Sequence, residues 1–215
     1  VTIRSPLQNL DSWVSKTSQS LEKMHGRIIE LLRFLDEAFF RMHDTLLLRL
    51  EDIKQRPTQS LKMMTNWLGI EKTGSMDNMT VFGKKWWGDP ASPDYLRDGM
   101  NPFGHSSINR ELKFFTKSDL NKLSVIFYPI SEFLGYCERD DGYYLHQASL
   151  IKEDLEGYFD FEKSFARENN LPLESLKMKL SYDNLRYRIR EKLFDAEGLE
   201  NYRTFLKHQN FYILD

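Results

Sequence analysis

The strongest structural signal in this chain is its opening stretch, residues 1–15, VTIRSPLQNLDSWVS. Its first three residues have the β-branched character of a short buried strand. Ser5 and Pro6 fit the cap and the first position of a helix, because proline needs no backbone donor there. Arg4 is therefore expected at the carboxyl end of the strand, and Ser12 about two turns into the helix.

An arginine and a hydroxyl placed in this way suit a phosphate group. The guanidinium of Arg4 offers two donors to phosphate oxygens, the Ser12 hydroxyl can add a third, and the start of a helix favours anions. The alternative is a surface arginine and a serine on a polar helix face, since both residue types are common near strand-to-helix turns. Spacing alone favours this alternative.

A second block follows at residues 45–70, TLLLRLEDIKQRPTQSLKMMTNWLGI. Leu46–Leu50 are almost continuously apolar, as expected of a strand in a parallel sheet that is buried on both faces. Pro57 is expected to begin a helix and Gly69 to end it in the left-handed conformation. The buried stripe of this helix is predicted to comprise Leu61, Met64 and Leu68.

The acidic pair Glu51 and Asp52 in this block could be mistaken for catalytic carboxylates. Adjacent residues at a strand end point in opposite directions and cannot readily share one substrate, so a structural role is favoured.

A third block, residues 108–136, reads INRELKFFTKSDLNKLSVIFYPISEFLGY. Thr116 and Asp119 approximate a capping box, and the helix that follows is expected to kink at Pro129. Between the second and third blocks lies a loop at 81–107, rich in glycine, proline and aromatic residues. Loops of this length in compact domains are usually functional or mobile.

Two features of this loop are candidates for binding. Trp86 and Trp87 could cover an adenine or a sugar, or could equally plug the space beneath the loop. His105, beside two serines, could act as a base or contact a phosphate, although a histidine in a solvated turn is favoured.

In this order, the blocks resemble sulfotransferases that use 3′-phosphoadenosine 5′-phosphosulfate. RSPLQNLDS is similar to the family's 3′-phosphate-binding segment, which implies that Arg4 and Ser12 bind the donor. The loop is similar to a G-x-x-W-x-G-N-S pattern, and on this basis Trp87 and Gly88 are assigned to the cofactor. Asn109 and Glu111 stand where the third block of the family has glycine and tryptophan, which leaves Arg110 open as a ligand contact.

The resemblance implies an α/β fold with a P-loop-like parallel sheet flanked by helices, predominantly helical in this fragment. It implies transfer of a sulfuryl group to a hydroxyl on a small molecule or glycan, without a metal. The family's phosphosulfate loop and most of its catalytic bases precede the arginine segment, and no GxxxxGK[ST] pattern follows Arg4. We therefore expect a fragment of a longer enzyme and assign no catalytic residue.

Two alternatives remain. One is a noncatalytic helical binding or scaffolding module, which the missing loop favours. The other, a relative of nucleotide kinases, is less favoured because such enzymes need the same loop.

Composition limits the possible classes. The 215 residues are 40% hydrophobic and 13% aromatic, which is enough for one substantial core. A net charge of −2 gives no general attraction to nucleic acid, and no stretch has the length and apolar character of a membrane span. Cys137 is the single cysteine, so a reducing compartment such as the cytoplasm is expected, with the thiol as a small apolar residue rather than a nucleophile. The five histidines show no zinc-site spacing.

We expect a sulfotransferase-like domain at residues 1–136 and a helical extension at 137–215. The first domain should include a long helix at Leu21–Met42. Breaks between helices of the extension are expected near Asn169–Pro172 and near Gly198. The basic run RYRIREK, residues 186–192, is interpreted as a solvated helix face rather than as a surface for an anionic partner.

Overall fold

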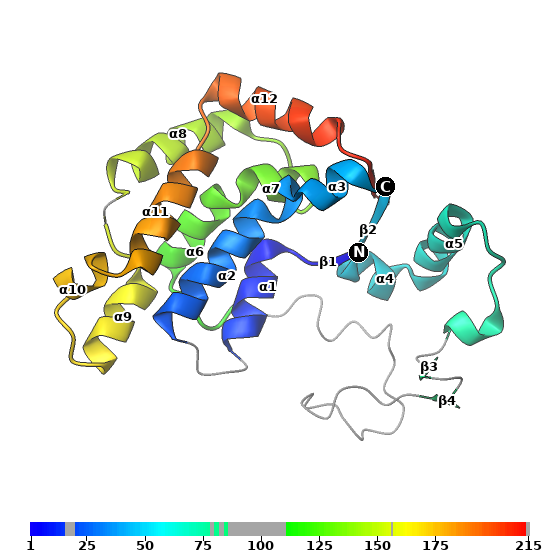
Figure 1. Cartoon of the computed structure of the whole chain (residues 1–215), viewed down its shortest axis with the longest axis horizontal. Helices are drawn as coiled ribbons and strands as arrows, with labels where there is room; N and C mark the ends of the chain where they lie inside the picture. Colours follow the sequence, from blue (N-terminus) through cyan, green and yellow to red (C-terminus); the bar gives the residue numbers. More distant parts are fainter. Residues whose placement is uncertain (16–19, 78–79, 82–83, 86–110, 156, 214–215) are drawn as a thin grey trace. The chain divides into compact units, whose positions relative to one another are not determined.

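A computed structural model describes residues 1–15, 20–77, 80–81, 84–85, 111–155 and 157–213. Helices predominate, and a small three-stranded parallel sheet gives the chain a coarse α/β character (Figure 1). The chain forms two compact units. The first comprises Val1–Arg4, Asp44–Glu111 and Phe211–Asp215, and the second comprises Ser5–His43 and Leu112–Asn210. The sequence boundary after residue 136 thus falls inside the second unit.

The first unit is built around the parallel sheet, with strand order β1-β2-β5. Its elements are β1 (Thr2–Ile3), β2 (Thr45–Arg49), α4 (Leu50–Gln55), α5 (Pro57–Leu68), η2 (Gly74–Asp77), β3 (Thr80–Val81), β4 (Lys84–Lys85) and β5 (Phe211–Ile213). The short strands β3 and β4 form a separate antiparallel pair.

The central strand β2 has the pairing that its apolar sequence predicts. Its residues Thr45 to Leu48 are buried, and strands flank it on both sides. Ile3 pairs with Arg49 on one side, and Leu47 pairs with Ile213 on the other. The strand begins one residue earlier than expected, and Leu50 already belongs to α4.

Helix α5 has the expected ends. Pro57 occupies its first turn, and Gly69 follows it with a φ of 66°, a left-handed conformation that glycine adopts without a steric penalty. The predicted buried stripe is wrong, because Leu68 is exposed and the buried residues of this helix are Ser60 and Thr65.

The second unit is entirely helical among its described residues. Its elements are α1 (Pro6–Val14), α2 (Leu21–Arg33), η1 (Phe34–Asp36), α3 (Ala38–Met42), α6 (Lys117–Ile126), α7 (Tyr128–Phe133), α8 (Asp141–Glu153), α9 (Asp160–Glu168), α10 (Glu174–Lys177), α11 (Leu180–Lys192) and α12 (Ala196–Lys207). Helices α2 and α11, far apart in sequence, lie side by side (Figure 1). One apolar core joins residues from both halves of the chain, among them Leu10, Ile28, Leu123, Tyr144 and Leu185.

The single long helix expected at Leu21–Met42 is wrong. Helix α2 ends at Arg33, a 3₁₀ turn follows, and Glu37 adopts an extended conformation before α3. Asp36 in this turn forms an ion pair with Lys192, with Nζ and Oδ2 2.6 Å apart, and accepts a hydrogen bond from Tyr202. These tertiary contacts hold the break in place.

The third block has the predicted kink and part of the predicted cap. The helix is interrupted at Phe127, two residues before Pro129, yet Phe127 keeps right-handed helical dihedrals and its amide donates to the Leu123 carbonyl at 2.9 Å. Thr116 caps α6 as predicted by accepting from the Asp119 amide. The Asp119 carboxylate instead accepts from the amides of Asp160 and Phe161, so the capping box is only half formed.

Helices in the C-terminal part end near the predicted places. A turn follows Glu168, and Asn170 there has a φ of 52°. The second break lies before α12 rather than at Gly198, whose amide donates to the capping side chain of Asp195.

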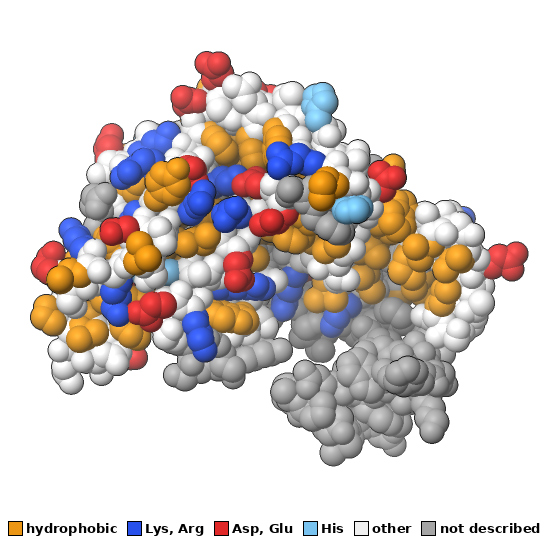
Figure 2. All heavy atoms as spheres, viewed as in Figure 1, with side chains coloured by type: hydrophobic (Ala, Val, Ile, Leu, Met, Phe, Trp, Pro, Cys, Tyr) orange, Lys and Arg blue, Asp and Glu red, His pale blue; other side chains and the backbone are white. Residues whose placement is uncertain are grey.

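The described residues carry a mixed surface. On the face shown in Figure 2, basic, acidic and apolar side chains are interspersed. Among the described helices, none has the length and apolar character needed to cross a membrane.

Candidate functional site

Arg4 directly follows β1, as the sequence predicts. The N-terminal amine of Val1 donates to the Leu46 carbonyl at 2.7 Å, and Ile3 is buried opposite Arg49. Arg4 is half-buried at the carboxyl end of this strand pair. In open α/β sheets, ligands bind at that edge, so the arginine has a suitable position for an anion.

Helix α1 begins where expected but without the expected cap. Ser5 occupies the capping position and Pro6 the first helical position, yet the Ser5 side chain makes no capping hydrogen bond. The predicted capping bond is therefore wrong. This leaves the first turn of the helix without a side-chain acceptor from Ser5, a condition that favours an external anion.

Ser12 lies on the last turn of α1 and is half-buried. Its hydroxyl has no hydrogen-bond partner among the described residues, so it can still donate to a ligand. Arg4 belongs to the first unit and Ser12 to the second, and each is described within its own unit. Their joint action on one phosphate remains a prediction.

Asp11, the neighbour of Ser12, is a buried structural residue that the sequence prediction does not include. Only 1% of it is exposed, and its Oδ1 accepts from the amides of Lys113 and Phe114 at 3.0 and 2.9 Å. Its Oδ2 is buried and has no partner among the described residues. The signal was available, because Asp11 lies at helical spacing from the apolar residues Leu7 and Val14.

Of the acidic pair at the start of α4, Asp52 has a clear structural role. Asp52 is buried and forms ion pairs with Arg49 and Arg56, the latter with a nitrogen–oxygen distance of 2.5 Å. The two acids lie in a helical turn rather than at a strand end. Asp52 thus neutralises the arginines that flank α4 in the unit that also contains Arg4.

A buried charged network in the second unit was also missed. Glu162 is completely buried; its carboxylate contacts His25 Nε2 at 2.8 Å and accepts from Arg186 at 2.5 and 3.1 Å. The Phe159 amide donates to it as well, and the Arg186 guanidinium stacks on the Tyr182 ring with its carbon 4.0 Å from the centroid. Burial alone would raise the pKa of Glu162, but the hydrogen bonds from His25 and Arg186 outweigh it and hold the pKa below its ordinary 4.5.

This network corrects the interpretation of RYRIREK as a solvated face. Arg186 and Lys192 are both buried, while Arg190 is exposed as expected. Burial lowers the pKa of Lys192, which pairs with Asp36.

A serine also approaches this network. Ser181 Oγ is 3.1 Å from His25 Nδ1, and His25 Nε2 contacts Glu162. A serine, a histidine and a carboxylate are thus linked by consecutive hydrogen-bond contacts, as in acyl-transfer enzymes. Because His25 is wholly buried and the carboxylate also binds a guanidinium, we interpret the arrangement as structural.

The remaining predicted site residues, Trp87 and Gly88, lie outside the described residues, as do Trp86, His105 and Arg110. Within the described ranges, no group of three or more histidine, cysteine, aspartate or glutamate side chains is placed to hold a metal ion.

Comparison of the chain with protein-family models, curated proteins and solved structures finds no match in any of the three.

Proposed function

We propose that this chain carries the 3′-phosphate-binding part of a sulfotransferase that uses 3′-phosphoadenosine 5′-phosphosulfate. The observation that carries the proposal is the local structure of residues 1–14, a parallel strand followed by Arg4 and then by a helix that begins at Pro6. The proposal includes a P-loop-like sheet of which β1 and β2 would form part. The single cysteine suits a cytoplasmic enzyme.

Arg4 would supply the main recognition of the nucleotide. An arginine fork donates two parallel hydrogen bonds to phosphate oxygens, and these charge-assisted bonds are stronger than neutral ones. Its half-buried position supports this role, since partial exclusion of water strengthens the interaction. The neighbouring Arg49 is already paired with Asp52, so its charge is balanced within the protein.

Helix α1 would supply the second contribution. Its first turn lacks a capping side chain, and Ser12 further along offers a hydroxyl that no described residue engages. The Ser12 hydroxyl fits the donor set that a phosphate monoester needs beside the Arg4 guanidinium.

In the proposed reaction, the acceptor oxygen bonds to sulfur while the bond from sulfur to the 5′-phosphate oxygen breaks, and the hydroxyl proton passes to a base. Positioning and charge stabilisation supply most of the rate in such a transfer. Arg4 and Ser12 would bind the 3′-phosphate, which is remote from the transferred group. They would therefore determine affinity and the position of the donor rather than carry out the chemical step. The acceptor is a hydroxyl on a small molecule or glycan.

Calorimetric titration with adenosine 3′,5′-bisphosphate tests the proposal. We expect binding to the wild type that Ser12→Ala weakens about 10- to 100-fold, the effect of losing one hydrogen bond to a charged group. Ser15→Ala is the matched control, because Ser15 is exposed just beyond the same helix. Absence of wild-type binding would contradict the proposal and favour the alternative, a noncatalytic helical scaffold.

A further inference from the structure

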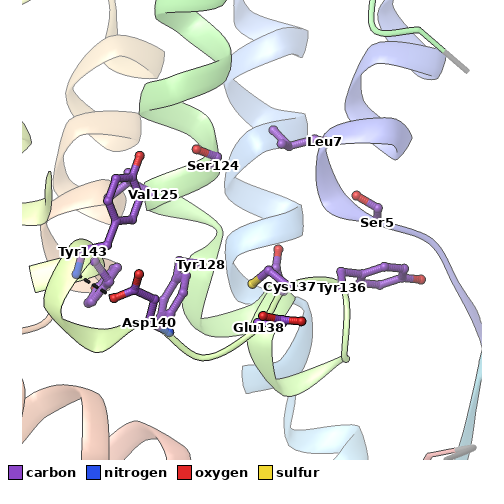
Figure 3. Close-up of a pocket in the computed structure, with 12 residues that line it drawn as sticks. Ser5, Leu7, Ser124, Val125, Tyr128, Tyr136, Cys137, Glu138, Asp140 and Tyr143 are labelled. Carbon is purple, nitrogen blue, oxygen red and sulfur yellow. Dashed lines mark hydrogen bonds between the residues drawn. The ribbon is translucent and has the colours of Figure 1, made fainter. Parts of the chain in front are cut away.

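The helical unit contains a cavity of about 270 Å³, close to the lower end of the usual range for small-molecule sites. Helices α1, α6, α7 and α8 and the segment between α7 and α8 contribute to its walls. Figure 3 shows Ser5 and Leu7 on one side, Tyr143 on the other, and Cys137 and Glu138 between them. All these residues belong to one unit.

Aromatic rings form one wall of the cavity. Tyr128 and Tyr144 stack with their centroids 4.7 Å apart and their planes 15° apart. Their hydroxyls are used within the protein, because Tyr128 accepts from the Asp140 amide at 2.7 Å and Tyr144 accepts from the Phe194 amide at 2.9 Å. Tyr128 and Tyr144 are buried and form the inner part of this wall. The ring surface open to a ligand comes from the exposed Tyr143 and the half-buried Tyr136, and such surface attracts apolar groups and cations.

The charged groups at the cavity are acidic. Glu138 and Asp140 line it, whereas no lysine, arginine or histidine does so among the described residues. Glu138 is exposed and has no ion-pair partner in the described part of the chain. Partial burial of the Cys137 thiol, and secondarily the charge of Glu132, raise its pKa.

The nearby arginines cannot readily reverse this field. Arg203 donates to Asp141 at 2.6 Å and to Glu132 at 3.0 Å. Arg139 donates to Asp141 at 2.8 Å and to Glu200 at 2.6 Å. Both guanidiniums are thus already engaged with carboxylates.

We propose that this cavity binds a small primary ammonium ion with an aromatic body. The ring would pack against the tyrosine wall, and the ammonium group would lie towards Glu138 at the exposed rim. The two proposals are tested separately, because Arg4 and Ser12, which would bind the nucleotide, do not line this cavity.

Cys137 provides a direct readout, because it lines the cavity, is exposed and is the single cysteine of the chain. Its alkylation by iodoacetamide in the full chain can be followed by mass spectrometry. Three probes of similar shape differ in charge: 2-phenylethylammonium, 2-phenylethanol and 3-phenylpropionate. We expect saturating 2-phenylethylammonium to slow alkylation about fivefold or more, with a dissociation constant about tenfold below those of the other two, as for a partly desolvated charge interaction.

The variant Glu138→Gln tests the charge without disturbing the core. This variant should bind 2-phenylethylammonium about two- to fivefold more weakly than the wild type, the range for an exposed ion pair. Its affinity for 2-phenylethanol should be unchanged. Glu153→Gln, an exposed acid on α8 that does not line the cavity, is the matched control and should behave as the wild type. Equal protection by all three probes, no protection by the amine, or an unchanged affinity in Glu138→Gln would each overturn the proposal.

Discussion

Substitution of Glu162 by glutamine should destabilise the helical unit more than any surface change. Glu162 is completely buried on α9 and accepts hydrogen bonds from the Arg186 guanidinium and the Phe159 amide. It also contacts His25 on α2. One carboxylate therefore connects three helices.

The expected magnitude follows from what remains after the substitution. Arg186 is 4% exposed, and without the carboxylate it would keep the Gly157 carbonyl and the Tyr182 ring but no counter-charge. Removing one partner of a buried ion pair costs about 3 to 5 kcal/mol. At about 2 to 4 °C per kcal/mol for a domain of this size, the melting temperature should fall by about 6 to 20 °C.

Urea unfolding followed by tryptophan fluorescence, together with a thermal melt, measures this loss in free energy. Glu153→Gln should change the free energy of unfolding by less than about 0.5 kcal/mol, as expected of an exposed site. Adding Arg186→Met to Glu162→Gln removes the unpaired cation, so the double variant should lose less than the sum of the single losses. A loss below about 1 kcal/mol for Glu162→Gln, or strict additivity in the double variant, would refute this reasoning.

Three further predictions concern other parts of the chain. Asp11→Ala should lower the free energy of unfolding by about 2 to 3 kcal/mol, because the amides of Lys113 and Phe114 lose their acceptor. Asp11→Asn should lower it less, and urea unfolding of both variants measures the difference. Hydrogen bonds from Arg203 lower the pKa of Asp141 from 3.8 to about 2, so its contribution to stability should be complete above 3.8 and vanish as the pH falls towards 2. Asp141→Asn should reduce the fall in the free energy of unfolding between pH 3.8 and pH 2. An unchanged fall in this variant would contradict the proposed role of Asp141. Gly69→Ala should cost about 1 kcal/mol because of the left-handed backbone, whereas Gly26→Ala in α2, where a Cβ meets nothing within 4 Å, should stabilise by about 0.5 to 1 kcal/mol.

The local structure around the candidate nucleotide site could be predicted from sequence because its signals are local. A proline at a first helical position and an apolar strand specify α1 and β2 within a few residues. Gly69 fixes the end of α5 for the same reason, since glycine adopts its left-handed conformation at little cost.

Other features depend on contacts between distant residues, which no short pattern encodes. Strand β5 pairs with β2 from the far end of the chain, where no strand was expected. The break at Asp36 depends on Lys192, and the burial of Arg186 depends on Glu162. The sequence of a basic run does not show which distant carboxylates neutralise it, so its burial cannot be predicted from the run alone.

The cavity beside Cys137 could not be predicted from sequence either. Its walls come from four helices and a connecting segment, and their side chains meet only through tertiary packing. The contacts of Asp11 also depend on tertiary packing. Its helical spacing from apolar residues nevertheless indicates a buried carboxylate.

The most direct test of the central claim is whether Arg4 recognises a 3′-phosphate. The measurement is calorimetric comparison of adenosine 3′,5′-bisphosphate with adenosine 5′-phosphate, on the wild type, on Arg4→Ala and on the exposed control Arg33→Ala. The wild type and Arg33→Ala should prefer the bisphosphate, and Arg4→Ala should lose about 10- to 100-fold of that preference, the value of a charge-assisted pair. A preference that survives in Arg4→Ala, or no preference in the wild type, would contradict the account.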